Sequence, residues 1–173
     1  MRRAVFVDKD GTLVVNVPYN VDPERIALTP GAEQGLARLT GTGYRVIVVS
    51  NQPGAALGVF AETALKNVET RLGELVPLDG FYYCPHAPDE GCGCRKPQPG
   101  LLERAAREQD IDLSSSWMIG DILDDIEAGR RAGCRTILLD VGNETEWLLN
   151  DERSPHHIAR DLSEAADIIA AAS

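Results

Sequence analysis

Two aspartates that follow a hydrophobic segment are the first residues able to do chemistry. Asp8 and Asp10 lie two positions apart, directly after the segment 3–7. Side chains two residues apart in extended backbone point to the same side, and two close carboxylates repel each other unless a cation or a shared proton relieves them. One carboxylate of such a pair can attack phosphorus while its neighbour protonates the leaving oxygen. Asp residues after strands also serve as turn residues, so the pair alone does not establish catalysis.

A second acidic group follows another short hydrophobic segment that ends at Gly120. It contains Asp121, Asp124 and Asp125. If both segments are parallel strands, their carboxyl ends meet at one edge of the sheet. Three or more carboxylates there predict Mg²⁺, which prefers six oxygen ligands. Asp125 either supports these ligands or is a solvated or capping residue in the first turn of a helix, where the dipole favours acidic side chains.

Donor side chains are expected at the same edge. Ser50 and Asn51 follow the apolar segment 45–49, and Lys96 precedes a helix expected over 98–109. A hydroxyl, an amide and an ammonium group beside Mg²⁺ describe a site for a phosphoryl group, because phosphoryl transfer depends mainly on positioning and charge neutralisation. A lysine such as Lys96, taken alone, is more often a surface residue, and its place directly before Pro97 in the order of the motifs is what favours a role in the site.

Three of the four cysteines crowd around one histidine. Cys84, His86, Cys92 and Cys94 supply three thiolates and one imidazole, a closed tetrahedral set for a structural Zn²⁺. The loop is rich in Pro and Gly, so a metal would order it. The spacing is not that of a zinc finger, and buried thiols or a chance cluster remain alternatives. Cys134 is expected to be a buried, inert thiol.

Four motifs in order resemble those of the haloacid-dehalogenase-like phosphatases. They are Asp8-Lys9-Asp10-Gly11-Thr12, Ser50-Asn51-Gln52, Lys96-Pro97, and Gly120-Asp121 with Asp125 four residues later. The resemblance implies that Asp8 is a nucleophile that forms an aspartyl phosphate, and that Asp10 is the general acid and then the base. It also implies Mg²⁺ on Asp8, Asp121 and the backbone carbonyl of Asp10. Ser50 and Lys96 would hold the transferring phosphoryl oxygens.

The cysteine loop is similar to that of one branch of this family. Residues 83–86 and 92–97 resemble the zinc-bearing loop of the D-glycero-D-manno-heptose 1,7-bisphosphate phosphatases, a pattern that histidinol-phosphate phosphatases largely share. The resemblance implies that zinc orders a loop that presents Arg95 and Lys96 to the substrate. Substrate contacts are expected from four further residues: Asn16, Tyr19, Asn51 and Gln52.

Two positions depart from that branch. Leu57 stands where the branch commonly has Arg, and Ile122 stands where it often has Lys. Both missing cations belong to the region that would hold a second phosphate. The hydrolytic residues are unaffected, but the identity of the sugar phosphate is left open, with histidinol phosphate or another small phosphomonoester as the alternative.

The elements that must position these residues alternate between strand and helix. Strands are expected over 3–7, 45–49, 80–83, 117–119 and 135–139, because these segments are apolar or end in polar loops. Amphipathic helices are expected over 31–42, 61–74, 98–109, 123–132 and 161–172. This order predicts an α/β fold with a doubly wound parallel sheet, as a single domain spanning 1–173. The short gap between the first two motifs leaves no room for a large cap domain, so closure must come from 13–30 and the cysteine loop.

Composition narrows the function. The chain has 173 residues, 43% of them hydrophobic, and a net charge of −10. The hydrophobic content predicts a globular domain, and the negative charge disfavours binding to nucleic acid. An uncapped site could still admit the phosphorylated end of a nucleic acid. No signal segment or membrane span is visible, so a cytoplasmic monomer acting on a small molecule is expected.

Two other functions remain open at this point. A receiver-like module that accepts a phosphoryl group also uses an acidic group, a hydroxyl and a lysine, but it lacks the second aspartate, Asp10, that speeds hydrolysis. A zinc-dependent binding protein with a vestigial acidic edge is the other possibility. The last thirty residues carry no motif that can be interpreted, and His156 and His157 are expected to be solvent-exposed.

Overall fold

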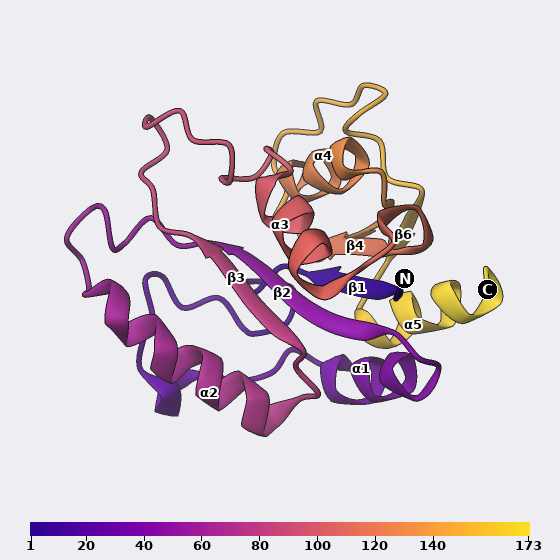
Figure 1. Cartoon of the computed structure of the whole chain (residues 1–173), viewed down its shortest axis with the longest axis horizontal. Coiled ribbons are helices and arrows are strands. Elements are labelled where there is room, and N and C mark those ends of the chain that lie inside the picture. Colours follow the sequence, from indigo (N-terminus) through magenta and orange to yellow (C-terminus); the bar gives the residue numbers. More distant parts are fainter.

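The computed structural model describes all of residues 1–173 and contains one six-stranded parallel sheet (Figure 1). Its strands lie in the order β3-β2-β1-β4-β5-β6 and share one direction. The five expected strands are confirmed, and a sixth was not expected. Their bounds are β1 Ala4–Val7, β2 Arg45–Asn51, β3 Gly80–Cys84, β4 Trp117–Gly120, β5 Arg135–Leu139 and β6 His157–Ala159.

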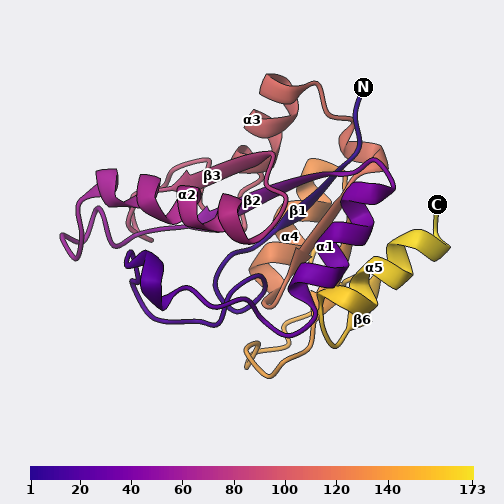
Figure 2. The same ribbon diagram turned by 90° about the horizontal axis from the view of Figure 1, so that it is seen from below.

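Five α-helices cover the two faces of the sheet (Figure 2). Helices α1, α2 and α5 pack in one hydrophobic cluster with the strand residues Val5 and Val7, whereas α3 and α4 contribute to the cluster that contains Ala4 and Phe6. Because both faces are covered, successive strand residues are buried without alternation, as the sequence indicated. The doubly wound α/β fold is confirmed. The helices are α1 Ala32–Gly41, α2 Leu65–Leu75, α3 Gly100–Gln109, α4 Leu123–Ala132 and α5 Leu162–Ala171.

The sheet reverses its winding between β1 and β4. Strand β1 pairs with β2 on one side and with β4 on the other, with Val7 opposite Ile119. In open α/β sheets the crevice at such a reversal, outside the carboxyl ends of the strands, is the usual ligand site. Asp8 and Asp121 each follow the last residue of one of these two strands. The topology therefore places the first and fourth motifs side by side.

The segment 13–30, the cysteine loop and the loop after β5 all lie near this edge. The segment contains one short 3-10 helix, Pro23–Arg25, and a bridge between Val14 and Leu28. No large cap domain is present, as expected. None of the helices has the length and hydrophobicity that a membrane span requires.

The last thirty residues complete the sheet and cover its face. Strand β6 extends the sheet beyond β5, and α5 packs against α1. His156 and His157 are exposed, as expected, and His156 Nδ1 accepts a hydrogen bond from Thr136 N at 3.0 Å.

Candidate active site and metal centres

A buried lysine joins two aspartates at the carboxyl edge of the sheet. Lys96 Nζ donates to Asp8 Oδ1 at 2.6 Å and to Asp125 Oδ1 at 2.7 Å. Its third donor goes to the backbone carbonyl of Val49 at 2.9 Å. An ammonium group has three donors, so all of them are used and the side chain is fixed. The Lys96 side chain is 3% exposed, and those of Asp8 and Asp125 are 13% and 1% exposed.

Asp121 completes a group of three carboxylates. One oxygen from each of Asp8, Asp121 and Asp125 lies within 4.8 Å of the others. Asp125 Oδ2 also accepts from the backbone N–H groups of Asp121 and Ile122 at 3.2 and 3.3 Å. Both oxygens of Asp125 are therefore engaged by protein donors. This arrangement, in which Asp125 is bound to Lys96 and to the backbone of its own segment, fits the supporting role expected for Asp125.

The charge balance of this group fits a divalent cation. Burial, together with the charges of Asp8 and Asp125, raises the pKa of Asp121 to about 8. Burial and the charge of Asp8 also raise the pKa of Asp125, although Lys96 opposes that shift. Burial by itself would lower the pKa of Lys96, but Asp125 and Asp8 outweigh it and raise the pKa, so this lysine stays charged. One ammonium group does not neutralise three carboxylates, and an oxygen-only donor set of this kind suits Mg²⁺.

Asp10 lies beside the three carboxylates but is turned toward another partner. Its Oδ1 accepts from Lys9 Nζ at 2.8 Å, and the Lys9 side chain is 4% exposed while that of Asp10 is 32% exposed. Burial raises the pKa of Asp10, and Lys9 opposes the shift. The second aspartate of the pair is thus held at the edge of the site in a setting that favours its protonated form.

Residues of the second motif form hydrogen bonds with one another and with the backbone of Lys96. Ser50 is buried at the end of β2, and its Oγ accepts from Gln52 Nε2 at 2.8 Å. Asn51 Oδ1 accepts from the backbone N–H of Lys96 at 3.0 Å, and Asn51 Nδ2 donates to the Lys96 carbonyl at 3.2 Å. The side chains of Asn51 and Gln52 therefore position Lys96 and Ser50, a role that the sequence did not reveal.

The four residues of the cysteine loop come together as expected. His86 Nδ1 lies 3.3 Å from Cys84 Sγ and 3.2 Å from Cys94 Sγ, and Cys84 Sγ lies 3.5 Å from Cys92 Sγ. None of the thiols forms a disulfide. Burial opposes ionisation of Cys92, but hydrogen bonds from the backbone of Arg95 and Cys94 outweigh it and lower the Cys92 pKa to about 6. Three thiols, one of them readily ionised, and an imidazole fit a closed Zn²⁺ site.

The fourth cysteine stands apart. Cys134 is 4% exposed in the core cluster beneath α3 and α4, outside the metal-binding group. Burial raises its pKa to about 12. The expectation of a buried thiol is confirmed.

Three further residues were expected to contact substrate: Arg95, Asn16 and Tyr19. Arg95 borders a cavity of about 220 Å³ together with Lys96, and its Nη1 is buried without a hydrogen-bond partner. Asn16 is exposed and lines a separate cavity of about 490 Å³ that reaches Gly11. Tyr19 is 50% exposed, and its φ of 54° is in the left-handed region, which is uncommon for a residue other than glycine.

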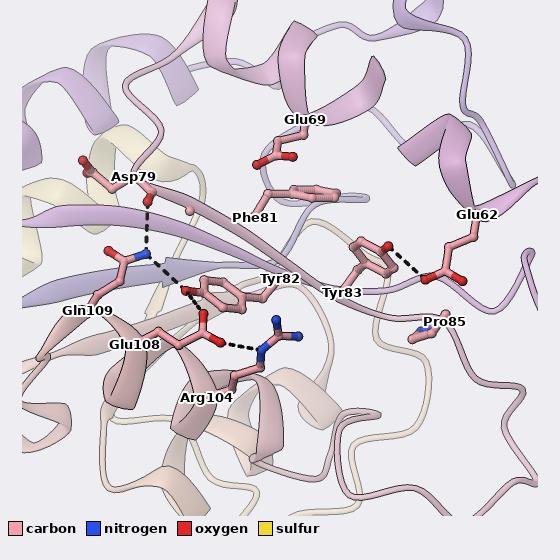
Figure 3. A pocket seen from close by; sticks show the side chains of 11 residues that line it. Glu62, Glu69, Asp79, Phe81, Tyr82, Tyr83, Pro85, Arg104, Glu108 and Gln109 are labelled. Atoms are coloured by element: carbon pink, nitrogen blue, oxygen red, sulfur yellow. Dashed lines mark hydrogen bonds and ion pairs between the residues drawn. The ribbon is translucent and has the colours of Figure 1, made fainter. Parts of the chain in front are cut away.

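A cleft of about 470 Å³ along the outer edge of β3 is separated from β1 by β2 (Figure 3). Its polar side chains bind one another. Tyr83 OH donates to Glu62 Oε1 at 2.9 Å, and Glu108 accepts from both Tyr82 OH, at 2.8 Å, and Arg104 Nε, at 2.9 Å. The cleft contains none of the expected site residues.

One contact at the carboxylate edge was missed by sequence reasoning. Asn143, in the loop after β5, donates to Asp121 Oδ2 at 2.7 Å. Thr12 Oγ1 donates to the other oxygen, Asp121 Oδ1, at 3.0 Å. Thr12 belongs to the first motif, but a single asparagine in a loop carries no signal that would have identified it.

Comparison with known proteins places these motifs in a family. A family model described as HAD-hydrolase-like matches residues 93–165. The D-glycero-beta-D-manno-heptose-1,7-bisphosphate 7-phosphatase of Pseudomonas aeruginosa is 35% identical over 159 residues, covering 85% of this chain and 86% of that protein. The enzyme of the same name from Photorhabdus laumondii is 38% identical over 164 residues, covering 85% and 87%.

A solved structure is similar over the whole chain. The D,D-heptose 1,7-bisphosphate phosphatase from B. bronchiseptica, crystallised with magnesium and phosphate, superposes with a TM-score of 0.86 at 30% identity. The match covers 99% of each chain. The fold, the four ordered motifs and these relatives agree. The chain therefore belongs to the haloacid-dehalogenase-like phosphatases, in the branch that contains the D-glycero-D-manno-heptose 1,7-bisphosphate 7-phosphatases.

Proposed function

We propose that this protein removes the 7-phosphate of D-glycero-β-D-manno-heptose 1,7-bisphosphate and leaves the heptose 1-phosphate. The observation that carries the proposal is the fully engaged Lys96, which holds Asp8 and Asp125 beside Asp121 at the reversal of the sheet. Relatives with this activity in their names are 35–38% identical to the chain, which supports the choice of substrate.

Asp8 is the proposed nucleophile. One oxygen of its carboxylate attacks the phosphorus of the 7-phosphate, the bond between phosphorus and the C7 oxygen breaks, and an aspartyl phosphate forms. Lys96 donates to Asp8 Oδ1, so the free oxygen is the one available for attack. The positive charge of Lys96 also offsets charge that develops on the phosphoryl oxygens. The Ser50 hydroxyl supplies a further donor.

Asp10 is the proposed acid and base. It gives its proton to the C7 oxygen as that oxygen leaves, and the sugar departs with a hydroxyl group. It then takes a proton from the water that attacks the aspartyl phosphate, and this step releases phosphate and restores Asp8. Burial raises the pKa of Asp10, which favours the protonated form needed in the first step.

The metal sites have separate roles in the proposal. Mg²⁺, when bound by Asp8, Asp121 and the backbone carbonyl of Asp10, supplies positive charge to the transferring phosphoryl group. Zn²⁺, held by Cys84, His86, Cys92 and Cys94, is structural. The zinc loop leads directly into Arg95 and Lys96, so ordering it fixes both cations before the substrate arrives.

Specificity for the second phosphate rests on fewer cations than in related enzymes. Leu57 is 52% exposed and Ile122 is partly exposed, and neither offers a charge. Arg95 is the cation with a free donor, because its buried Nη1 has no partner. This shortage of cations favours a second candidate, hydrolysis of histidinol phosphate or another small phosphomonoester by the same residues.

We further propose that the protein works in the cytoplasm as a monomer on a small sugar phosphate. The free cysteines suit a reducing compartment, and a net charge of −10 disfavours a nucleic-acid substrate.

The test is phosphate release with Mg²⁺ from four substrates: both anomers of heptose 1,7-bisphosphate, histidinol phosphate and an aryl phosphate. Preference for the β-anomer, with heptose 1-phosphate as the product, supports the proposal. Release only from the monoesters would support the same mechanism but would identify a small phosphomonoester as the substrate. No release from any of them, together with a long-lived phosphorylated protein, favours a receiver-like role and contradicts the proposal.

A further inference from the structure

We propose that Asn143 is a positioning residue for Mg²⁺ binding, because it orients the carboxylate of Asp121. The inference rests on the proposed role of Asp121 as a metal ligand. Under this inference Mg²⁺ affinity depends also on a residue of the loop after β5, which carries none of the four motifs.

Two donors hold the Asp121 carboxylate from opposite ends. Asn143 Nδ2 donates to Oδ2 at 2.7 Å, and Thr12 Oγ1 donates to Oδ1 at 3.0 Å. The Asp121 side chain is buried, and its remaining neighbours include the carboxylates of Asp8 and Asp125. These like charges push Asp121 away from the place where an ion would sit, so fixed donors are needed to keep it there.

The packing at Gly11 restricts this hydrogen bond further. Gly11 has a φ of +87°, a conformation that side chains rarely adopt, and a β-carbon there would collide with Asp121 Oδ2 and lie 2.7 Å from Asn143 Nδ2. The backbone of the first motif therefore lies directly against the contact between Asp121 and Asn143. The amide and the carboxylate have little freedom to rearrange on that side.

The neighbouring residue fixes the loop to the same part of the fold. Glu144 Oε2 accepts from the backbone N–H of Leu123 at 2.7 Å, at the start of α4. Asn143 thus binds the side chain of Asp121, and Glu144 binds the backbone of Leu123. This second anchor holds the residue next to Asn143 against the start of α4.

The expected consequence is a specific loss of Mg²⁺ affinity. Groups that hydrogen-bond a metal ligand set its orientation, and removing one commonly weakens metal binding by about 10- to 100-fold. Without the Asn143 amide, Asp121 Oδ2 loses its donor, and Thr12 alone holds the carboxylate against the repulsion of Asp8 and Asp125. The affinity for substrate at saturating Mg²⁺ is not expected to change, since Asn143 acts through Asp121.

The test is a calorimetric titration with Mg²⁺ alone, on zinc-loaded protein without substrate. For Asn143→Leu we expect a dissociation constant about tenfold or more above that of the parent. Activity assays should show the same increase in the Mg²⁺ concentration needed for half-maximal rate, with KM for substrate unchanged at saturating Mg²⁺. Thr12→Val, which removes the donor on the other oxygen, should behave in the same way.

Controls separate this role from a general loss of structure. Asn67→Leu changes an exposed asparagine on α2 in the same way and should leave the Mg²⁺ dissociation constant unchanged. If Asn143→Leu fails to fold, Asn143→Ser supplies the test with a smaller side chain. Parent-like Mg²⁺ affinity in a folded Asn143 variant overturns the inference. Because the titration uses no substrate, failure of the proposed phosphatase activity would be seen separately.

Discussion

Lys96 Nζ lies 2.7 Å from Asp125 Oδ1, and both side chains are almost completely buried. The lysine comes from the loop before α3 and the aspartate from the first turn of α4. Their contact joins the two helices on one face of the sheet at its carboxyl edge. Because Asp8 shares the same ammonium group, the proposed nucleophile is positioned by a residue that also holds the fold together.

Lys96→Met should destabilise the protein as well as inactivate it. Removing one partner of a buried ion pair typically costs about 3–5 kcal/mol, because the remaining charge is left unpaired. We expect a loss of this order in the free energy of unfolding at pH 8, measured with urea. The loss should shrink at pH 5, since Asp125, whose pKa is raised, then takes up a proton.

Lys66→Met is the matched control for this variant. Lys66 is exposed and pairs only with Glu69 on the same helix, an interaction worth a few tenths of a kcal/mol. Equal stability losses in the two variants would contradict the role assigned to Lys96.

The Mg²⁺-free protein should lose stability as the pH rises. Asp121 has a pKa raised from 3.8 to about 8, so the folded protein retains a proton that the unfolded chain releases. The free energy of unfolding therefore decreases as the pH rises from about 4 to about 8, and it does not recover at higher pH. Saturating Mg²⁺ should reduce the fall, because it replaces the proton as the positive charge. Urea unfolding at several pH values, with and without Mg²⁺, measures both effects, and Asp121→Asn should show a smaller slope.

Cys92→Ser should release zinc and lower activity. The Cys92 thiol has a pKa lowered to about 6, and its loss leaves the cluster with three ligands. We expect zinc content well below one equivalent and a loop that is cleaved faster by proteases. Cys134→Ser is the matched control and should retain its zinc. One equivalent of zinc and full activity in Cys92→Ser would refute the zinc site.

The sequence was sufficient to predict the sheet, because its strands are continuous apolar segments that end in polar loops. The same reasoning missed β6, a three-residue strand in which His157 and Ile158 are exposed. Helix starts shifted where local geometry intervened. The segment Glu62–Ala64 forms a 3-10 turn before α2, and α3 begins at Gly100, after Pro99.

The site residues were predictable by type but not by partner. The two sets of metal-binding residues could be predicted from spacing and motif order, because each ion prefers certain side chains: carboxylates for Mg²⁺, and thiols and imidazole for Zn²⁺. The hydrogen-bond partners of Asn51 and Gln52 could not be predicted, because both side chains bind polar groups within the protein. Asn143 is 22 positions from Asp121, and only the folded chain shows that they touch.

Leu57→Arg should strengthen the preference for a substrate with a second phosphate. The side chain is 52% exposed beside the second motif, so an arginine is tolerated there. A charged hydrogen bond to phosphate contributes about 1.5 kcal/mol or more, which corresponds to roughly a tenfold lower KM for the bisphosphate. Hydrolysis of a monoester such as an aryl phosphate should be unchanged. An equal effect on both substrates would show that Leu57 does not face the second phosphate.

The central claim is that Asp8 becomes phosphorylated. The most direct measurement uses Asp10→Asn, in which loss of the base should lengthen the life of the aspartyl phosphate by roughly 10²- to 10⁴-fold. The protein is mixed with Mg²⁺ and an aryl phosphate, whose leaving group departs without a proton from Asp10, so that loss of the acid does not prevent formation of the aspartyl phosphate. It is then quenched, reduced with borohydride and mapped by mass spectrometry. The account predicts modification at Asp8, absent without Mg²⁺ and absent in the Asp8→Asn, Asp10→Asn double variant. Phosphate release by the parent protein with no phosphorylation of Asp8 in Asp10→Asn, or phosphorylation at another residue, would contradict it.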